Sequence, residues 1–256
     1  MNDRINHLIT LYQISSKHSN YQILPKAVSD LIPSDSLTTL SRYEKERMDF
    51  LRKHMVLEGK RILDIGGNTG YFSFESLAAG ALEVTYIEGN PQHAEFVHEA
   101  ASILDAPLKA INAYADFDSG LPGAPYDVIL LFNVLHHFGD DFGDSAISIE
   151  EARNKIKKSI QSLNGQTRQL VLQLGFCWKG NRNHILFGSG SKQEMIDFVK
   201  EAVNGYWEIE HIGIAEGSRE HIGYAPLNDD NIQRRDDLGE FLNRPIFILR
   251  TLKSSL

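Results

Sequence analysis

Short apolar runs alternate along the middle of the chain with segments of helical periodicity. The runs are partly β-branched and bounded by glycine or polar residues, as is typical of buried parallel strands. They cover residues 61–65, 82–87, 108–113, 126–132 and 169–174. Helical segments over residues 90–104, 148–163 and 191–203 begin at Asn or Ser N-caps. This alternation predicts an α/β fold with a doubly wound, mostly parallel sheet.

The two ends of the chain follow other patterns. Residues 1–40 have no sustained period and contain two prolines, so we expect an N-terminal cap or extension there and a single domain over 41–256. Ser41 and Glu44 have capping-box spacing and predict a helix up to Gly59. Residues 206–215 and 245–251 are strand candidates separated by a polar, turn-rich span, which predicts an antiparallel C-terminal edge and seven strands in all.

Charge, cysteine content and the length of the apolar runs disfavour a nucleic-acid-binding, disulfide-bonded or membrane-spanning protein. The 26 Lys and Arg residues stand against 34 Asp and Glu residues, and the net charge of −8 disfavours a nucleic-acid partner. The single cysteine, Cys177, cannot form an internal disulfide, and no apolar run approaches the ~20 residues of a membrane span. We therefore expect a cytoplasmic protein without a membrane span.

A glycine-rich turn follows the first predicted strand, in the run LDIGGNTGYFS. Gly66, Gly67 and Gly70 leave room for a ligand close to the backbone, and Asn68 tolerates left-handed geometry. The second predicted strand ends near Glu88, 22 residues after Gly66, where a carboxylate can accept hydrogen bonds from ribose hydroxyls. Loop and acid together predict a nucleoside-containing cofactor. A nicotinamide dinucleotide is the competing cofactor, but G-x-G-x-x-G spacing and a Tyr-x-x-x-Lys dyad are missing.

These motifs, together with YDVILLFNVLHHF at the fourth strand, resemble the cofactor-binding motifs of class I S-adenosylmethionine (SAM)-dependent methyltransferases. The resemblance covers residues 44–175, and Asn68 stands where many members have a glycine. The resemblance implies a Rossmann-like domain that binds SAM. It further implies that Asp64 and the 66–70 loop contact the amino-acid portion of SAM. It also implies that Glu88 holds the ribose, that Asp116 bonds the adenine, and that Asn133 faces the methionine part.

Two histidines follow the fourth predicted strand, at the edge of the sheet where ligands bind in open α/β folds. His136 and His137 are candidates for a general base that deprotonates an alcohol acceptor, with Asp140 or Asp141 orienting the imidazole. The same four side chains are competent ligands for a divalent cation, but their spacing selects no metal, so we expect metal-independent chemistry.

The segment after the fifth predicted strand combines aromatic, amide and cationic side chains. Trp178 could stack on a sugar or base, and Lys179 and Arg182 could pair with a phosphate or carboxylate of the acceptor. Nearer the N-terminus, the run SRYEKER contains Arg42 and Arg47, which could approach the carboxylate of the cofactor, as an N-terminal helix does in related methyltransferases.

The sequence thus favours a SAM-dependent methyltransferase that O-methylates a small-molecule or glycan-linked acceptor, such as a sugar or phosphosugar of a bacterial glycan pathway. Two alternatives stay open, a tRNA-modifying methyltransferase and a SAM-binding regulatory protein without catalysis. Similar histidine pairs and aromatic loops occur in enzymes of surface-glycan pathways and in tRNA wobble-uridine modifiers, and motif kinship does not fix the acceptor.

Overall fold

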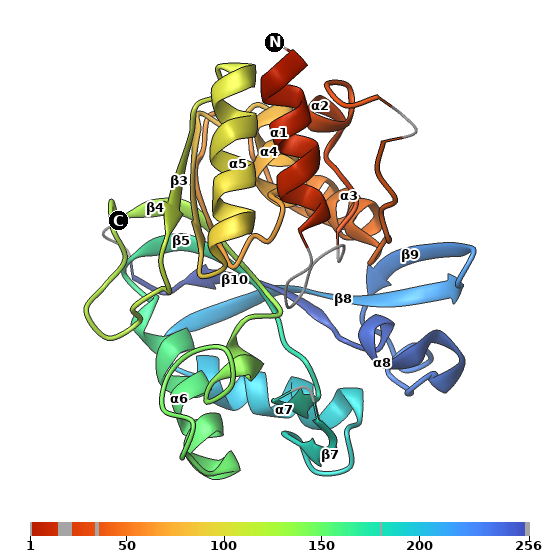
Figure 1. Ribbon diagram of the computed structural model, residues 1–256. Coiled ribbons are helices and arrows are strands. Elements are labelled where there is room, and N and C mark those ends of the chain that lie inside the picture. The colour runs from red at the N-terminus through yellow and green to blue at the C-terminus, as the bar shows by residue number, and fades with distance from the viewer. Residues whose placement is uncertain (1, 15–21, 34–35, 180, 254–256) are drawn as a thin grey trace. The chain divides into compact units, whose positions relative to one another are not determined.

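A computed structural model describes residues 2–14, 22–33, 36–179 and 181–253 (Figure 1). The chain forms two compact units, residues 1–115 and residues 116–256. This division falls inside the domain predicted for residues 41–256.

The first unit contains a parallel three-stranded part of the sheet, in the order β3-β2-β1. Its strands are β1 (Arg61–Ile65), β2 (Glu83–Glu88) and β3 (Leu108–Asn112). The helices α3 (Glu44–His54), α4 (Tyr71–Ala78) and α5 (Pro91–Leu104) precede or link them. Asn90 caps α5 as predicted, because its side chain accepts the N–H groups of Gln92 and His93.

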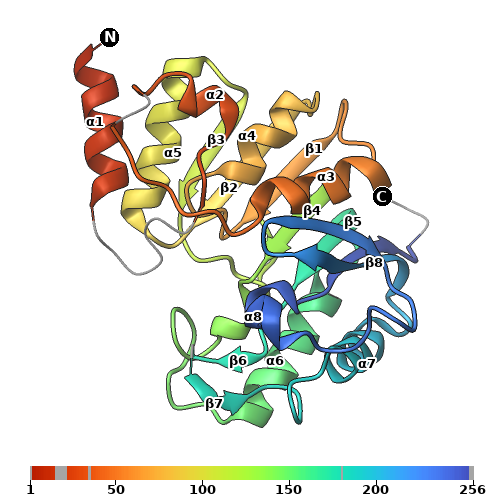
Figure 2. The same cartoon turned by 90° about the vertical axis from the view of Figure 1, so that its right-hand side faces the viewer.

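The N-terminal segment packs on this unit through α1 (Asn2–Gln13), which runs alongside α5 in both views (Figures 1 and 2). Leu8 and Tyr12 are buried in one apolar cluster with Phe96 of α5. At the surface, the Arg4 guanidinium lies 2.5 Å from the Glu99 carboxylate. Helix α2 (Lys26–Ser29) follows, and residues 15–21 and 34–35 of the predicted cap lie outside the described residues. The described part of the segment is therefore built into the core of the first unit.

The helix predicted from the Ser41 and Glu44 spacing begins later than expected. Tyr43, in left-handed geometry with φ of 60°, is the N-cap residue of α3, and its side chain makes no capping hydrogen bond. The buried Glu44 carboxylate instead accepts the N–H of Arg42 at 2.8 Å. The capping-box prediction at this position is wrong, because Glu44 turns into the protein and bonds the residue ahead of the cap.

The second unit holds the other strands, in the order β4-β5-β10-β8-β9. Strands β4 (Tyr126–Phe132) and β5 (Thr167–Gln173) are parallel, and β10 (Ile246–Thr251) is antiparallel to both β5 and β8 (Trp207–Ser218). The predicted antiparallel C-terminal edge is confirmed. The helical elements are η1 (Leu135–His137), α6 (Ile149–Ser162), α7 (Lys192–Val203), η2 (Asp236–Leu238) and α8 (Gly239–Leu242). A separate ribbon consists of β6 (Cys177–Trp178) and β7 (Asn181–Ile185).

The main sheet has eight strands in the described part of the chain, one more than predicted. The additional strand is β9 (His221–Pro226), which pairs antiparallel with β8 from His221 opposite Ser218 to Pro226 opposite Gly213. Its side chains are exposed or half-buried, so the backbone ladder and not apolar burial holds it in place. A polar edge strand of this kind lacks the apolar pattern by which the other strands were predicted.

The two remaining capping boxes agree with the prediction. Ser148 with Glu151 opens α6, and Ser191 with Glu194 opens α7, each with both reciprocal hydrogen bonds. The fold is thus a mostly parallel sheet with helices and an antiparallel edge, as in Rossmann-like methyltransferases. Among the described residues, no helix is long and apolar enough to cross a membrane.

Candidate functional site

The glycine loop between β1 and α4 has backbone geometry that requires small residues. Gly66 and Gly70 have φ of 67° and 80°, and Asn68 adopts the predicted left-handed conformation with φ of 52°. A Cβ atom on Gly67 would lie 2.7 Å from both the Asp64 carboxylate and the Tyr86 ring. At Gly67 the loop therefore lies so close to Asp64 and Tyr86 that there is no room for a side chain.

Asp64 lies beneath this loop and is 2% exposed. Burial is the main cause that raises the pKa of its carboxyl to about 7, and hydrogen bonds from the hydroxyl and backbone N–H of Ser73 act in the opposite direction. The Ser73 hydroxyl donates to Asp64 at 2.7 Å. Asp64 thereby bonds a residue in the first turn of α4, and its charge changes near neutral pH.

Glu88, at the end of β2, is connected to the same loop. Its Oε2 accepts the N–H of Asn68 at 3.0 Å, and its Oε1 accepts the N–H of Asn90 at 2.9 Å. The Tyr86 hydroxyl donates to the carbonyl of Asn68 from the same strand. A carboxylate accepts at more positions than these two donors use, so the geometry is compatible with a further bond to ribose hydroxyls.

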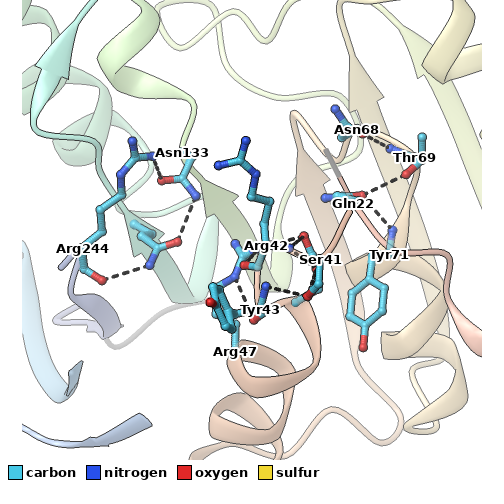
Figure 3. Close-up of polar contacts among 12 residues, drawn as sticks. Gln22, Ser41, Arg42, Tyr43, Arg47, Asn68, Thr69, Tyr71, Asn133 and Arg244 are labelled. Atoms are coloured by element: carbon cyan, nitrogen blue, oxygen red, sulfur yellow. Dashed lines mark hydrogen bonds and ion pairs between the residues drawn. The ribbon is translucent and has the colours of Figure 1, made fainter. Parts of the chain in front are cut away.

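Gln22, which the sequence interpretation did not identify, also holds the loop (Figure 3). Its Oε1 accepts from the Thr69 hydroxyl at 3.3 Å and from the N–H of Tyr71 at 3.4 Å. The N–H of Tyr71 opens α4, so this side chain caps the helix from a distant part of the chain. The two partners are 47 and 49 residues away, and no local pattern signals such a contact.

Of the basic side chains of SRYEKER, that of Arg47 is buried at the start of α3. Arg47 is 3% exposed, its Nη2 donates to the carbonyl of Arg42 at 3.2 Å, and it lies 3.5 Å from the Glu44 carboxylate. Its guanidinium also stacks 4.9 Å above the Phe72 ring. Burial raises the pKa of Glu44, against the effect of Arg47. Arg47 thus stabilises the first turn of α3 and its packing against α4.

The donor set of the first unit fits an amino-acid nucleoside such as SAM. Glu88 offers a carboxylate at the end of β2, Asp64 offers a second acid below the loop, and the loop leaves no side chain over its backbone at Gly66 and Gly67. Hydroxyls and an ammonium group are the partners that such acids bind.

In the second unit, Asn133 follows β4 in left-handed geometry with φ of 60°. Its side chain donates to Gln173 at 2.9 Å and accepts from Arg244 at 2.8 Å (Figure 3). Gln173 in turn donates to the carbonyl of Arg244, and Arg244 pairs with Glu240 at 2.5 Å. Asn133 is therefore held in a closed hydrogen-bonded ring, in which Arg244 comes from 111 residues away and was not predicted.

The two histidines differ in their surroundings. His136 is 5% exposed, and its Nδ1 accepts the N–H of Gly175 at 3.1 Å. A Cβ on Gly175 would lie 2.7 Å from the His136 ring. His137 is more exposed, and its Nδ1 lies 2.9 Å from Asp141 and 3.6 Å from Asp140. The structure therefore brings together His137 and the two acids, whereas His136 packs against the end of β5.

His137, Asp140 and Asp141 are also the described residues that could hold a metal ion. Their ligand atoms lie within 4.8 Å of one another. The same atoms form the ion pairs of His137, so the arrangement is compatible with either a metal centre or a histidine oriented by a carboxylate.

The predicted acceptor-side residues have different environments. Trp178 is 7% exposed, and its indole N–H donates to the carbonyl of Phe138 at 2.7 Å. Lys179 donates to the carbonyl of Ser145 at 2.7 Å and lies 4.4 Å above the Trp178 ring. Arg182 belongs to β7, and its side chain lies outside the described part of the chain.

Asp116 is exposed at the start of the second unit. Its carboxylate accepts the N–H groups of Asp118 and Ser119 at 2.9 and 3.1 Å. The hydrogen bond from the Ser119 hydroxyl is the main cause that lowers its pKa, and the two backbone N–H groups add to it. In the structure it closes a turn of its own loop.

Comparison with known proteins identifies the fold. No family model matches the chain, and no curated protein matches it. WbdD, solved with the kinase inhibitor LY294002, is similar with a TM-score of 0.59 and 13% identity over 96% of this chain and 47% of WbdD. A second structure, of "the bifunctional kinase-methyltransferase WbdD", has a TM-score of 0.55 and 13% sequence identity. The match covers 96% of this chain and 46% of that one. The 16S rRNA methylase RmtB has a TM-score of 0.51 and 11% sequence identity, and the match covers 98% of this chain and 75% of RmtB.

The chain thus spans about half the length of WbdD. At these identities the likeness shows the fold alone, and that fold is the one found in class I methyltransferases.

Proposed function

We propose that this chain, which has the class I methyltransferase fold, is a SAM-dependent methyltransferase that O-methylates a sugar or phosphosugar-type acceptor. The observation that carries the proposal is the hydrogen bond from the glycine loop to Glu88, at 3.0 Å from Asn68 N to Glu88 Oε2. This contact fixes an acid beside a loop that a ligand can approach closely, which is the arrangement that binds a ribose in this fold.

In this proposal Glu88, Asp64 and the glycine loop are the cofactor-binding residues of the first unit. Glu88 binds the ribose hydroxyls, and Asp64 with the loop from Gly66 to Gly70 contacts the amino-acid portion. Asp116 and Asn133 stay candidates for the adenine and methionine parts on the resemblance alone. When bound, SAM supplies a methyl group on a positively charged sulfur. The protein's task is to align the acceptor and exclude water.

His136 or His137 is proposed as the general base, and the contacts favour His137. Its Nδ1 lies 2.9 Å from Asp141, and a carboxylate in this position orients the imidazole. His136 uses its Nδ1 to accept the N–H of Gly175. It is better suited to support the neighbouring backbone than to receive a proton from the acceptor.

The acceptor class rests on charge and on the segment from Trp178 to Arg182. We assign the recognition of acceptor phosphate or carboxylate groups to Lys179 and Arg182. The Trp178 ring packs against the Lys179 ammonium group. The net charge of −8 favours a small or glycan-linked acceptor over RNA. The similarity to the rRNA methylase RmtB keeps an RNA acceptor as the second candidate.

The test is calorimetric titration with SAM and with NAD, followed by an acceptor screen that starts with glycosides. SAM binding that Glu88→Ala weakens, without NAD binding, supports the proposal. RNA binding that weakens steeply with salt would favour the second candidate. SAM binding without turnover on any acceptor would favour a regulatory SAM-binding protein.

A further inference from the structure

We propose that Gln22 is a cofactor-binding residue, whose side-chain NH2 group donates to the carboxylate at the amino-acid end of an adenosyl amino acid. This inference rests on the proposed function and assigns a residue to one end of its cofactor. The residue comes from the N-terminal segment, for which the sequence indicated no role.

Hydrogen bonds hold both the backbone carbonyl and the side chain of Gln22. The Tyr12 hydroxyl of α1 donates to its carbonyl at 3.1 Å, and Tyr12 is itself packed against Phe96 of α5 at 5.7 Å between ring centroids. The side chain is 9% exposed and its Oε1 is bonded by Thr69 and Tyr71. A buried side chain with two such contacts on an anchored backbone has a defined orientation.

That orientation determines where the amide nitrogen points. Oxygen and nitrogen lie on opposite sides of a planar carboxamide, and the oxygen is turned toward Thr69 and Tyr71. In Figure 3 the nitrogen of Gln22 accordingly faces away from these two residues. Within residues 22–33 and 36–115, the hydrogen bonds of this carboxamide are made by its oxygen. Its NH2 group is thus presented beside the loop.

The charges around the loop explain why a neutral donor is needed there. An amino-acid end carries an ammonium and a carboxylate, and the acids Asp64 and Glu88 suit the ammonium and the hydroxyls but repel the carboxylate. The first turn of α4 carries partial positive charge, and there the Gln22 oxygen accepts the N–H of Tyr71, which leaves the NH2 group on the other side of the carboxamide. Gln22 therefore supplies a donor for the carboxylate beside a loop whose neighbouring strands carry the acids Asp64 and Glu88 at or near their ends.

The test compares two ligands on the full-length protein by calorimetry. S-adenosylhomocysteine carries the amino-acid end, and methylthioadenosine has the same nucleoside and thioether without it. In Gln22→Glu, a carboxylate can still accept from Thr69 and Tyr71 but cannot donate. We expect its affinity for S-adenosylhomocysteine to fall about 10- to 100-fold, as for the loss of a hydrogen bond to a charged group, and its affinity for methylthioadenosine to stay within about two-fold.

Gln13→Glu is the matched control, because Gln13 lies in α1 and its side chain bonds the exposed carbonyl of Ser36. It should bind both ligands as the wild type does. Equal affinities of wild type and Gln22→Glu for S-adenosylhomocysteine, or an equal loss for both ligands, would overturn the assignment while leaving the proposed function intact. Wild-type protein that binds neither ligand would overturn both. Thermal melting confirms that Gln22→Glu is folded.

Discussion

The carboxylate of Glu88 accepts the backbone N–H of Asn68 at 3.0 Å, which ties the acid at the end of β2 to the glycine loop at the end of β1. The second oxygen accepts the N–H of Asn90, the N-cap residue of α5. One side chain thus sets the relative position of two loops that both border the proposed ribose site.

Replacing Glu88 should weaken cofactor binding. Glu88→Gln keeps one acceptor oxygen but loses the charge and one of the two backbone contacts, so we expect a 10- to 100-fold loss of SAM affinity by calorimetry. Glu83→Gln is the matched control, because Glu83 begins the same strand and pairs at the surface with Arg61 at 2.8 Å. A Glu88→Gln protein with wild-type affinity would remove Glu88 from the ribose site.

Gly67→Ala should destabilise the loop. The added methyl group would meet the Asp64 carboxylate and the Tyr86 ring at 2.7 Å, and both neighbours are buried. We expect a loss of about 1–3 kcal/mol in the free energy of unfolding, as for overpacked cores. Gly59→Ala offers a comparison, because a Cβ there meets nothing within 4 Å although its φ is 70°. The φ of Gly67 lies outside the left-handed region, so its loss comes from the contact, and a wild-type stability of Gly67→Ala would show that the neighbours give way.

Asp64 should make stability depend on pH. Its pKa is raised from 3.8 to about 7 in the folded protein, so its contribution is fully present below pH 3.8 and is lost as the pH rises through 7. Asp64→Asn stays neutral, so its stability relative to the wild type should increase between pH 5 and pH 8, by at most about 3 kcal/mol. Urea unfolding of both proteins at the two pH values measures this difference. A constant difference would mean that Asp64 titrates outside this range.

The two histidines should differ in their effect on turnover. His137→Gln should lower kcat about 10²- to 10⁴-fold with SAM affinity unchanged, because a general base acts on the acceptor. His136→Gln should chiefly lower the melting temperature, since it disturbs the bond to Gly175. If the losses in kcat were reversed between the two variants, His136 would be the base.

Removing metal ions should leave turnover unchanged. The atoms of His137, Asp140 and Asp141 that could bind a cation are close enough to form ion pairs without one. Protein dialysed against a chelator should therefore keep its kcat. Activity that is lost on dialysis and restored by Mg²⁺ or Mn²⁺ would reassign this cluster as a metal centre.

Local signals predicted the parts of the fold that depend on neighbouring residues. The capping boxes at Ser148 and Ser191 formed because both partners lie within one turn of the helix. The same spacing at Ser41 failed, because burial of Glu44 redirected its carboxylate to the N–H of Arg42. Tertiary packing overrides a capping signal when the side chain that would cap is drawn into the core.

The candidate site was predicted only where the chain itself brings residues together. The glycine loop and Glu88 lie at the ends of adjacent parallel strands, so their proximity follows from the strand order. Gln22 and Arg244 meet their partners across 47 and 111 residues, and neither lies in a recognisable motif. Contacts of such side chains can be identified only once the fold is known.

All the side-chain contacts described here that hold the glycine loop come from the first 115 residues, from Gln22, Tyr86 and Glu88. The histidines and the segment proposed to select the acceptor belong to the second unit. Mutations that accumulate in the second unit during evolution therefore leave those hydrogen bonds unchanged. If the proposed function holds, a lineage of such proteins can exchange one acceptor for another by drift and selection there while it inherits the hydrogen bonds of the glycine loop unchanged.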